Sequence, residues 1–163
     1  MDKTDKTDLE ISVLLYDKKY FADMLFCYLA AKDAVGKYAP DPQWGKPALK
    51  EDMLDIDNNY IKRGEVFYLA VDKDDRVAGM IGTKTVSETD IWLKRLFVKP
   101  DLKGRGIGSK LLLAVEEYAS AKGVTTIHTR FADWYREAAS FYPAKGFADA
   151  GRSGYLRHMV KSL

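Results

Sequence analysis

The segment Leu96–Tyr118, LFVKPDLKGRGIGSKLLLAVEEY, changes character twice: an apolar run gives way to a basic, glycine-rich bend, and the bend to a helix with leucines on one face. Glycines stand at alternate positions, Gly104, Gly106 and Gly108, where the helix is about to begin. The unpaired N–H groups of a first helical turn point back into such a bend and attract anions. Glycines there leave no side chain between the backbone and a bound phosphate. The segment therefore predicts a strand, a phosphate-binding loop and a helix.

Basic side chains surround this bend. Lys103, Arg105 and Lys110 add positive potential to that of the helix dipole. The combination predicts a site for a diphosphate rather than a glycine-rich turn that only connects two elements.

Two familiar phosphate-binding motifs do not fit. The P-loop ends in Gly-Lys-Ser/Thr, whereas Gly108 is followed by Ser109 and Lys110. The dinucleotide fingerprint fails because Ser109 stands where its third glycine belongs, and because the bend follows an antiparallel meander rather than opening a βαβ unit. A nucleotide-dependent kinase is therefore not indicated.

The length of 163 residues fits one domain, since a domain commonly takes roughly 100 to 200 residues. We expect residues 1–9, which begin with the polar MDKTDKTD, to be a frayed N-terminus and residues 10–163 to form a single domain. A net charge of +2 is too small to indicate nucleic-acid binding. The single Cys27 cannot form an internal disulfide, and no signal peptide or membrane span is recognisable, so we expect a cytoplasmic protein.

Hydrophobic periodicity predicts an α+β protein with one central sheet. The predicted order is β-α-α-β-β-β-α-β-α-β-β. The strands are expected at residues 10–15, 65–71, 76–86, 91–98 and 124–130, with two more in FADAG and YLRHMVK near the end, and the helices at residues 17–32, 48–62, 109–122 and 133–142.

The bend, Lys103-Gly104-Arg105-Gly106-Ile107-Gly108, and the later string AASFYPAKGF resemble the GCN5-related N-acetyltransferase (GNAT) family. That family carries Arg/Gln-x-x-Gly-x-Gly/Ala between its fourth strand and the following helix. The order of elements is similar from about Glu10 to Leu163. The resemblance implies an acyl-CoA N-acyltransferase fold, in which helices flank a mixed, mostly antiparallel central sheet. One departure is Lys103, which keeps the charge of the usual arginine but loses its planar fork.

The resemblance implies that acetyl-CoA binds as cosubstrate. Its pyrophosphate would lie on the amides of the bend, and its pantetheine arm would pair with a fourth strand that a bulge splays from the fifth. A backbone N–H near Phe97 or Val98 would polarise the thioester carbonyl. Relatives often carry an asparagine at the position of Tyr135, so the role of this residue stays open. The implied cofactor-binding residues are Leu96, Phe97, Val98, Lys103, Gly104, Arg105, Gly106, Ile107, Gly108, Ser109, Tyr135 and Ala138.

The resemblance also assigns a general acid. Tyr142 lies in FYPAKGF, which matches the family string FYxxxGF, and its hydroxyl would protonate the departing CoA thiolate. The alternative interpretation is a tyrosine that packs in the core beside Phe141.

The general base has two candidates. Many relatives carry a glutamate where this chain has Trp92. Glu88 and Asp90, in the turn just before this strand, would act as the base directly or through a water. His128 and His158 fall on different predicted strands without a Cys or carboxylate at metal-ligand spacing, so no metal site is indicated.

Three further groups admit two interpretations. Cys27 is expected to be a buried small hydrophobe rather than a nucleophile. Tyr38 and Trp44 lie in a loop that would either shape the acceptor pocket or be pinned by its own aromatics. Lys94 and Arg95 would contact the acceptor or line the sheet.

The sequence thus predicts an N-acetyltransferase that moves an acetyl group from acetyl-CoA to a primary amine by direct attack in a ternary complex. The acceptor would be a small molecule or a peptide. The alternative is a non-catalytic acyl-CoA-binding or regulatory module of the same fold. The last strand, YLRHMVK, would offer an edge for pairing in a homodimer.

Overall fold

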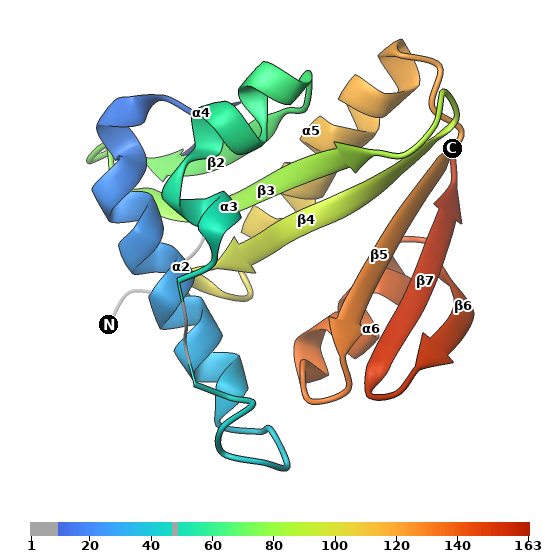
Figure 1. Ribbon diagram of the computed structural model, residues 1–163. Helices are drawn as coiled ribbons and strands as arrows, with labels where there is room; N and C mark the ends of the chain where they lie inside the picture. Colours follow the sequence, from blue (N-terminus) through green and yellow to red (C-terminus); the bar gives the residue numbers. More distant parts are fainter. Residues whose placement is uncertain (1–9, 47–48) are drawn as a thin grey trace.

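A seven-stranded sheet forms the centre of the protein, with strand order β1-β2-β3-β4-β5-β7-β6 (Figure 1). The computed structural model describes residues 10–46 and 49–163, so the predicted frayed segment, residues 1–9, lies outside the described residues. Neighbouring strands are antiparallel except β4 and β5, which are parallel. The strands are β1 (Ile11–Leu15), β2 (Phe67–Asp72), β3 (Val77–Thr85), β4 (Asp90–Val98), β5 (Thr126–Ala132), β6 (Ala148–Ser153) and β7 (Leu156–Ser162).

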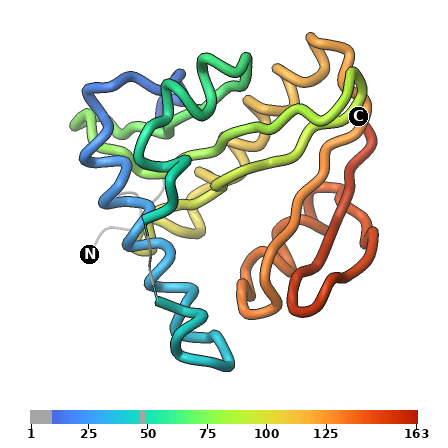
Figure 2. The backbone as a smooth tube through the Cα atoms, in the orientation of Figure 1, coloured from blue at the N-terminus to red at the C-terminus, as the bar shows by residue number. Residues whose placement is uncertain are grey.

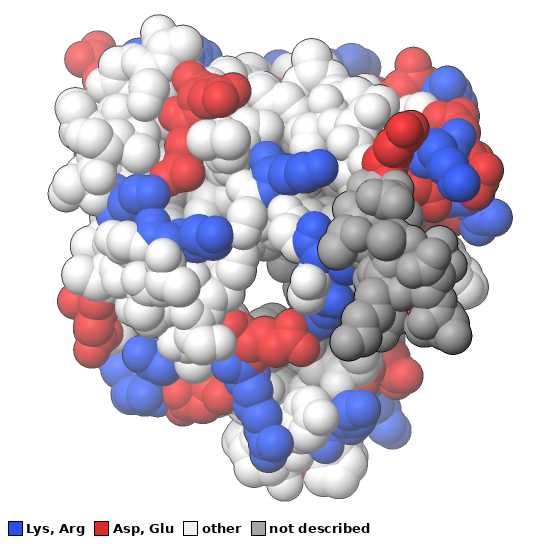
Figure 3. Space-filling view, turned by 180° about the vertical axis from the view of Figure 1, so that it is seen from behind, with Lys and Arg blue, Asp and Glu red and all other residues white. Residues whose placement is uncertain are grey.

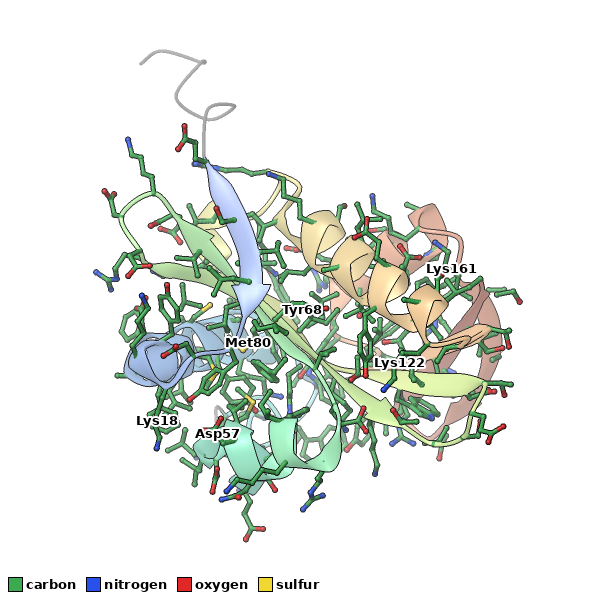
Figure 4. The ribbon with its side chains drawn as sticks, turned by 90° about the horizontal axis from the view of Figure 1, so that it is seen from above. Lys18, Asp57, Tyr68, Met80, Lys122 and Lys161 are labelled. Carbon is green, nitrogen blue, oxygen red and sulfur yellow. The ribbon has the colours of Figure 1, made fainter. Side chains whose placement is uncertain are left out.

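Helices cover both faces of the sheet. Seen from above, α2 and α5 lie on opposite sides of the strands, with Met80 turned toward α2 and Tyr68 toward α5 (Figure 4). None of the helices in the described ranges is long and apolar enough to cross a membrane. The helical elements are η1 (Lys18–Tyr20), α2 (Phe21–Gly36), α3 (Glu51–Leu54), α4 (Ile56–Asn59), η2 (Ile61–Arg63), η3 (Pro100–Leu102), α5 (Ile107–Ala121) and α6 (Arg136–Ala144).

Two hydrophobic clusters form the core, one on each face, because side chains alternate between the faces of a strand. The cluster under α5 and α6 includes Leu111, Ile127 and Tyr142. The cluster under α2 includes Cys27 and Tyr28, and Cys27 is fully buried there, as predicted. Burial raises the pKa of the Cys27 thiol to about 12, which leaves it unreactive.

The sheet opens between β4 and β5. The two strands pair only through Asp90, Ile91 and Trp92 of β4, and beyond this point they diverge, as the backbone trace shows (Figure 2). A bulge accompanies the parting: Met80 pairs with Phe97 and Gly82 with Lys94, so Ile81 of β3 faces two residues of β4. One of the two is Arg95, whose φ of 58° is unusual for a non-glycine residue.

The helix predicted over residues 48–62 is wrong in one respect: it is broken into α3, α4 and η2. Asp55 interrupts it, because its side chain accepts a hydrogen bond from the backbone N–H of Asn58 (3.0 Å) and caps a new helix. Similarly, α6 begins at Arg136 rather than near Asp133, and no side chain caps it. Short polar side chains compete with the backbone for hydrogen bonds, which periodicity does not capture.

The predicted edge position of the last strand is also wrong. β7 lies between β5 and β6, and the edge strands of the sheet are β1 and β6. The short β6 folds back on β7 through the turn at Gly154 and occupies the outer edge itself. Because β7 is paired on both sides, it offers no free edge for pairing in a homodimer.

Core packing under α5 gives a direct test of this fold. Leu111 is fully buried, whereas Leu113 on the same helix is 53% exposed. We expect Leu111→Ala to lower the free energy of unfolding by about 2–5 kcal/mol, because it leaves a cavity in the core. The control Leu113→Ala should change it by less than about 0.5 kcal/mol. Urea denaturation followed by circular dichroism measures both, and equal losses would contradict the packing of α5.

Candidate active site

A pocket of about 410 Å³ extends from the glycine bend along the free edge of β4 to Tyr142. Seen from behind, the protein surface is hollowed near its centre, and both basic and acidic side chains border the hollow (Figure 3). The pocket walls come from α2, β4, the bend, α5 and α6. The lining residues are Ala31, Val35, Leu96, Phe97, Val98, Leu102, Lys103, Gly104, Gly106, Ile107, Gly108, Ser109, Tyr135, Glu137, Ala138, Phe141 and Tyr142.

The predicted site residues converge on this pocket with few exceptions. Every residue predicted to bind the cofactor lines it except Arg105, and Tyr142 lines it too. Sequence reasoning missed Ala31 and Val35, which lie four residues apart on α2, and also Leu102, Glu137 and Phe141. The i, i+4 spacing on α2 was a readable signal, but nothing in the sequence shows that this helix lies against the bend.

The glycine bend presents backbone rather than side chains. Gly104 and Gly106 both have a φ of 79°, in the left-handed region that glycine adopts without strain. A Cβ at either position would meet no atom within 4 Å, so both residues face open space. Gly106 is also the N-cap of α5, and no side chain caps this helix. The first N–H groups of α5 are therefore available to an external acceptor.

The charges at the bend are arranged unevenly. Lys103 forms an ion pair with Glu137 of α6 (Nζ to Oε2, 2.9 Å) across the mouth of the pocket. Arg105, in contrast, does not line the pocket, and none of the residues that the structure describes forms an ion pair with it. Lys103 is thus the basic side chain of the bend that is best placed to contact a ligand.

Tyr142 lies at the inner end of the pocket, where its ring is 6% exposed. The ring stacks on Phe131 (centroids 5.6 Å apart) and meets Phe141 and Phe147 edge-on. Burial raises the pKa of Tyr142 to about 12, although a side-chain hydrogen bond with Thr129 of β5 acts to lower it. The phenol is therefore protonated throughout the physiological pH range.

Tyr135, whose role the sequence left open, lines the pocket and accepts a hydrogen bond from a lysine of α2. The Nζ of Lys32 on α2 donates a hydrogen bond to the Tyr135 hydroxyl (2.7 Å). Burial lowers the pKa of Lys32, and the nearby charge of Arg95 lowers it further. The same Nζ lies 5.9 Å from the centre of the Phe97 ring, so Lys32 bridges α2 and the free part of β4.

Arg95, at the bulge, is tied to α3. Its Nε and Nη2 donate to the two carboxylate oxygens of Asp52 at 2.9 and 2.7 Å, and the Tyr60 hydroxyl donates to the same carboxylate at 2.7 Å. Burial acts to raise the pKa of Asp52, but these hydrogen bonds hold it below its ordinary value. The bidentate pair fixes the unusual backbone of Arg95 and with it the shape of β4. Arg95 therefore has a structural role in β4, because its guanidinium is held by Asp52.

Neither of the two candidate bases, Glu88 and Asp90, lines the pocket that holds Tyr142. Glu88 is exposed in the turn before β4 and lines neither the pocket described above nor the smaller one beside Trp92. Asp90, the first residue of β4, has its Oδ2 only 2.6 Å from Nε2 of His128. That hydrogen bond, together with one from Thr89, lowers the pKa of Asp90. The structure thus places a histidine beside one candidate carboxylate and leaves the other in solvent.

The loop aromatics are pinned to the C-terminal half of the chain. Trp44 stacks on Trp134 (5.8 Å) and on Tyr155 (5.4 Å), and the guanidinium of Arg136 lies 4.1 Å from the centre of the Tyr38 ring. The loop therefore spans from α2 to the β5–α6 connection and the β6–β7 turn.

Residues 32–147 match the family described as "Acetyltransferase (GNAT) family". Among curated proteins, the chain is 32% identical to "Probable N-acetyltransferase camello" of Xenopus laevis over 100 residues, which are 60% of this chain and 46% of that protein. It is 38% identical to "Thialysine N-epsilon-acetyltransferase" of Bos taurus over 60 residues, 37% of this chain and 35% of that protein. The chain thus matches about half or less of the length of these curated relatives.

Solved structures with the same fold include PaiA N-acetyltransferase from Thermoplasma acidophilum in complex with coenzyme A. Its TM-score is 0.84 at 19% identity, over 94% of this chain and 99% of that chain. A GNAT-family acetyltransferase from Staphylococcus aureus gives a TM-score of 0.80 at 20% identity over the same shares of the two chains. At these identities the likeness shows the fold alone. The family match extends over more than half of the sequence and includes the glycine bend and Tyr142, and the chain therefore belongs to the acetyltransferase (GNAT) family.

Proposed function

We propose that the protein is an N-acetyltransferase that moves an acetyl group from acetyl-CoA to a primary amine while both substrates are bound. One observation carries this proposal: a single pocket joins an uncapped helix N-terminus, the unpaired edge of a bulged strand and a buried tyrosine. Membership of the family and the N-acetyltransferase names of its relatives support it.

The pocket fits a long ligand with a phosphate group at one end. The N–H groups of Ile107, Gly108 and Ser109 would hold the pyrophosphate, because they begin α5 without a capping side chain. The open space beside Gly104 and Gly106 lets a phosphate approach the backbone closely. Lys103 adds a charge that can be shared between a phosphate and Glu137. Acetyl-CoA supplies the activated acetyl thioester.

The free edge of β4 would position the thioester. The N–H of Lys99 donates to the carbonyl of Ala78 on β3 (2.8 Å), so it points away from the split. Because successive N–H groups of a strand point to opposite edges, the N–H of Val98 points into the split. Of the two donors named from the sequence, Phe97 and Val98, we therefore favour Val98 as the one that polarises the thioester carbonyl.

Tyr142 would serve as the general acid. Its high pKa keeps the phenol protonated, so it can donate a proton to the sulfur as the thiolate leaves. The aromatic contacts of its ring with Phe131 and Phe147 restrict its orientation. A protonated, buried phenol at the inner end of the pocket suits this role better than that of a base.

The phosphate cradle can be tested by comparing two glycines that flank α5, one before its start and one after its end. Gly106 and Gly123 both have a positive φ, 79° and 82°, and a Cβ at either would face open space, but only Gly106 lines the pocket. We expect Gly106→Ala to raise the Kd for acetyl-CoA at least about tenfold, because a methyl group would stand where the phosphate approaches. Gly123→Ala carries a similar backbone strain and should leave the Kd unchanged. Calorimetric titration measures both, and an equal loss in the two variants would argue against the cradle.

Tyr142→Phe separates the enzyme from an acyl-CoA-binding module. Thiol release from acetyl-CoA is followed with thialysine, L-lysine, spermidine and a lysine-containing peptide as acceptors. We expect wild-type turnover with at least one amine, and a loss of about 100-fold in kcat for Tyr142→Phe with unchanged acetyl-CoA binding, because the acid is removed and the ring is kept. Tyr118→Phe, at a partly buried position of α5 that lines neither pocket, is the control. A wild-type protein that binds acetyl-CoA but releases no thiol with any amine would indicate the binding module.

A further inference from the structure

Three hydrogen-bonded side chains, Asp90, His128 and His158, form a row on the face of the sheet opposite α5 and α6. The adjacent residues Ile127 and Met159 belong to the core under those helices, and side chains alternate between the faces of a strand. His128 Nε2 lies 2.6 Å from Asp90 Oδ2, and His128 Nδ1 lies 2.9 Å from His158 Nε2. The indole ring of Trp92 stacks on both imidazoles, with centroids 5.0 and 4.8 Å apart. This histidine row is therefore fixed by hydrogen bonds along its length and by stacking from one side.

The histidine row lies at the closed end of the split. Trp92 and His128 form the last pair between β4 and β5, beyond which the strands part. The next residue of β5, Thr129, points to the opposite face, toward Tyr142, whose pKa it acts to lower. The proposed acid and the histidine row thus flank β5 from its two sides, one residue apart along the strand.

The row ends at a second pocket. This pocket, of about 270 Å³, shares no lining residue with the larger one and lies on the open face of the sheet. His158, Trp92 and Arg130 line it together with residues 150–153 of β6 and Leu156. A substrate in this pocket would contact His158, whereas Asp90 and His128 do not line it.

Proton positions in the row follow from its hydrogen bonds. An ionised Asp90 accepts from Nε2–H of His128, so in the neutral state Nδ1 of His128 accepts from Nε2–H of His158. Nδ1 of His158 then carries a free lone pair and has no hydrogen-bond partner among residues 10–46 and 49–163. If Nδ1 of His158 takes up a proton, the proton on Nε2 of the same ring can pass to Nδ1 of His128. The positive charge then lies on His128, next to Asp90, and no heavy atom has to move.

We propose that His158 is the general base of the reaction, and that His128 and Asp90 are positioning residues that accept and stabilise the proton. This inference rests on the proposed acetyltransferase function. The acceptor enters from the second pocket as an ammonium ion and gives one proton to Nδ1 of His158. The nitrogen of the amine so formed bonds to the acetyl carbon, the carbon–sulfur bond breaks, and Tyr142 gives its proton to the sulfur. The nitrogen thus loses one proton to His158 before the attack and a second after it, and the second replaces the proton that Tyr142 gave to the thiolate.

The charges around His158 favour its neutral form. Burial lowers the pKa of His158, and His128 and Arg130 on β5 lower it further, whereas Asp149 on β6 acts in the opposite direction. Arg152 of β6, which also lines the second pocket, is paired with Asp133. A neutral imidazole at physiological pH is the form that accepts a proton.

The test combines kinetics with spectroscopy. With the amine that gives the fastest thiol release in the panel, wild-type kcat should rise through a pKa below 6.5 and then level off. His158→Gln should lower kcat at neutral pH by about 100-fold, and its kcat should keep rising toward the pKa of the amine itself, about 10. Asp90→Asn should move the acid limb to lower pH, because a charged histidine loses its counter-ion. The control is Arg157→Gln, which should keep the wild-type pH profile. Arg157 precedes His158 on β7, and its side chain lies against Phe131.

The chain contains only two histidines, so their imidazole ¹⁵N signals can be assigned from the His158→Gln spectrum alone. We expect the His158 ring to be neutral and protonated at Nε2 near pH 7.5, and this readout needs no turnover. An unchanged pH profile in His158→Gln, or a His158 protonated at Nδ1 in the neutral row, would overturn the proposal. A wild-type protein that binds acetyl-CoA but acetylates no amine would instead overturn the proposed function, and the role of His158 as a base with it.

Discussion

The parting of β4 from β5 is the constraint on which the rest of the site depends. A parallel ladder that ends at Trp92 and His128 leaves the second half of β4 with unpaired backbone groups, which would normally have to be satisfied within the sheet. The bulge at Arg95 keeps β4 paired with β3 while the strand bends away from β5. The hydrogen bonds of Arg95 to Asp52 hold the bulge in place. The bulge and the parting of the strands thus leave a slot beside β4, and the backbone N–H groups of β4 that face it are free to bind a ligand.

The split also separates two kinds of chemistry. The pocket that begins at the glycine bend is suited to a phosphorylated acyl donor and ends at Tyr142, whose burial keeps it protonated. The open face beside Trp92 carries the histidine row and a second pocket. In the proposed reaction, the donor and the acceptor reach the split from different pockets, and β5 stands between the acid and the base.

The sequence was sufficient where local spacing decides the structure and insufficient where strand register does. Alternate glycines before a leucine stripe predicted the bend and α5, and the resemblance placed Tyr142 in the pocket. His128 and His158 are thirty positions apart, and nothing local indicates that β7 inserts beside β5 and brings them within hydrogen-bonding distance. The same insertion of β7 between β5 and β6 makes it an interior strand, which the sequence did not indicate. Asp55 broke a predicted helix because a single side-chain cap outweighs the hydrophobic pattern around it.

The most direct measurement of the central claim is the exchange and chemical shift of backbone amides as acetyl-CoA is added to ¹⁵N-labelled protein. If the split and the uncapped helix hold the donor, the amides of Val98 and of Ile107–Ser109 should shift most and become protected from exchange, while the amides of β1 and β2 stay unchanged. Shifts confined to other parts of the sheet, with Val98 and the start of α5 unaffected, would contradict the account, because the donor would then bind without the backbone groups that the split exposes.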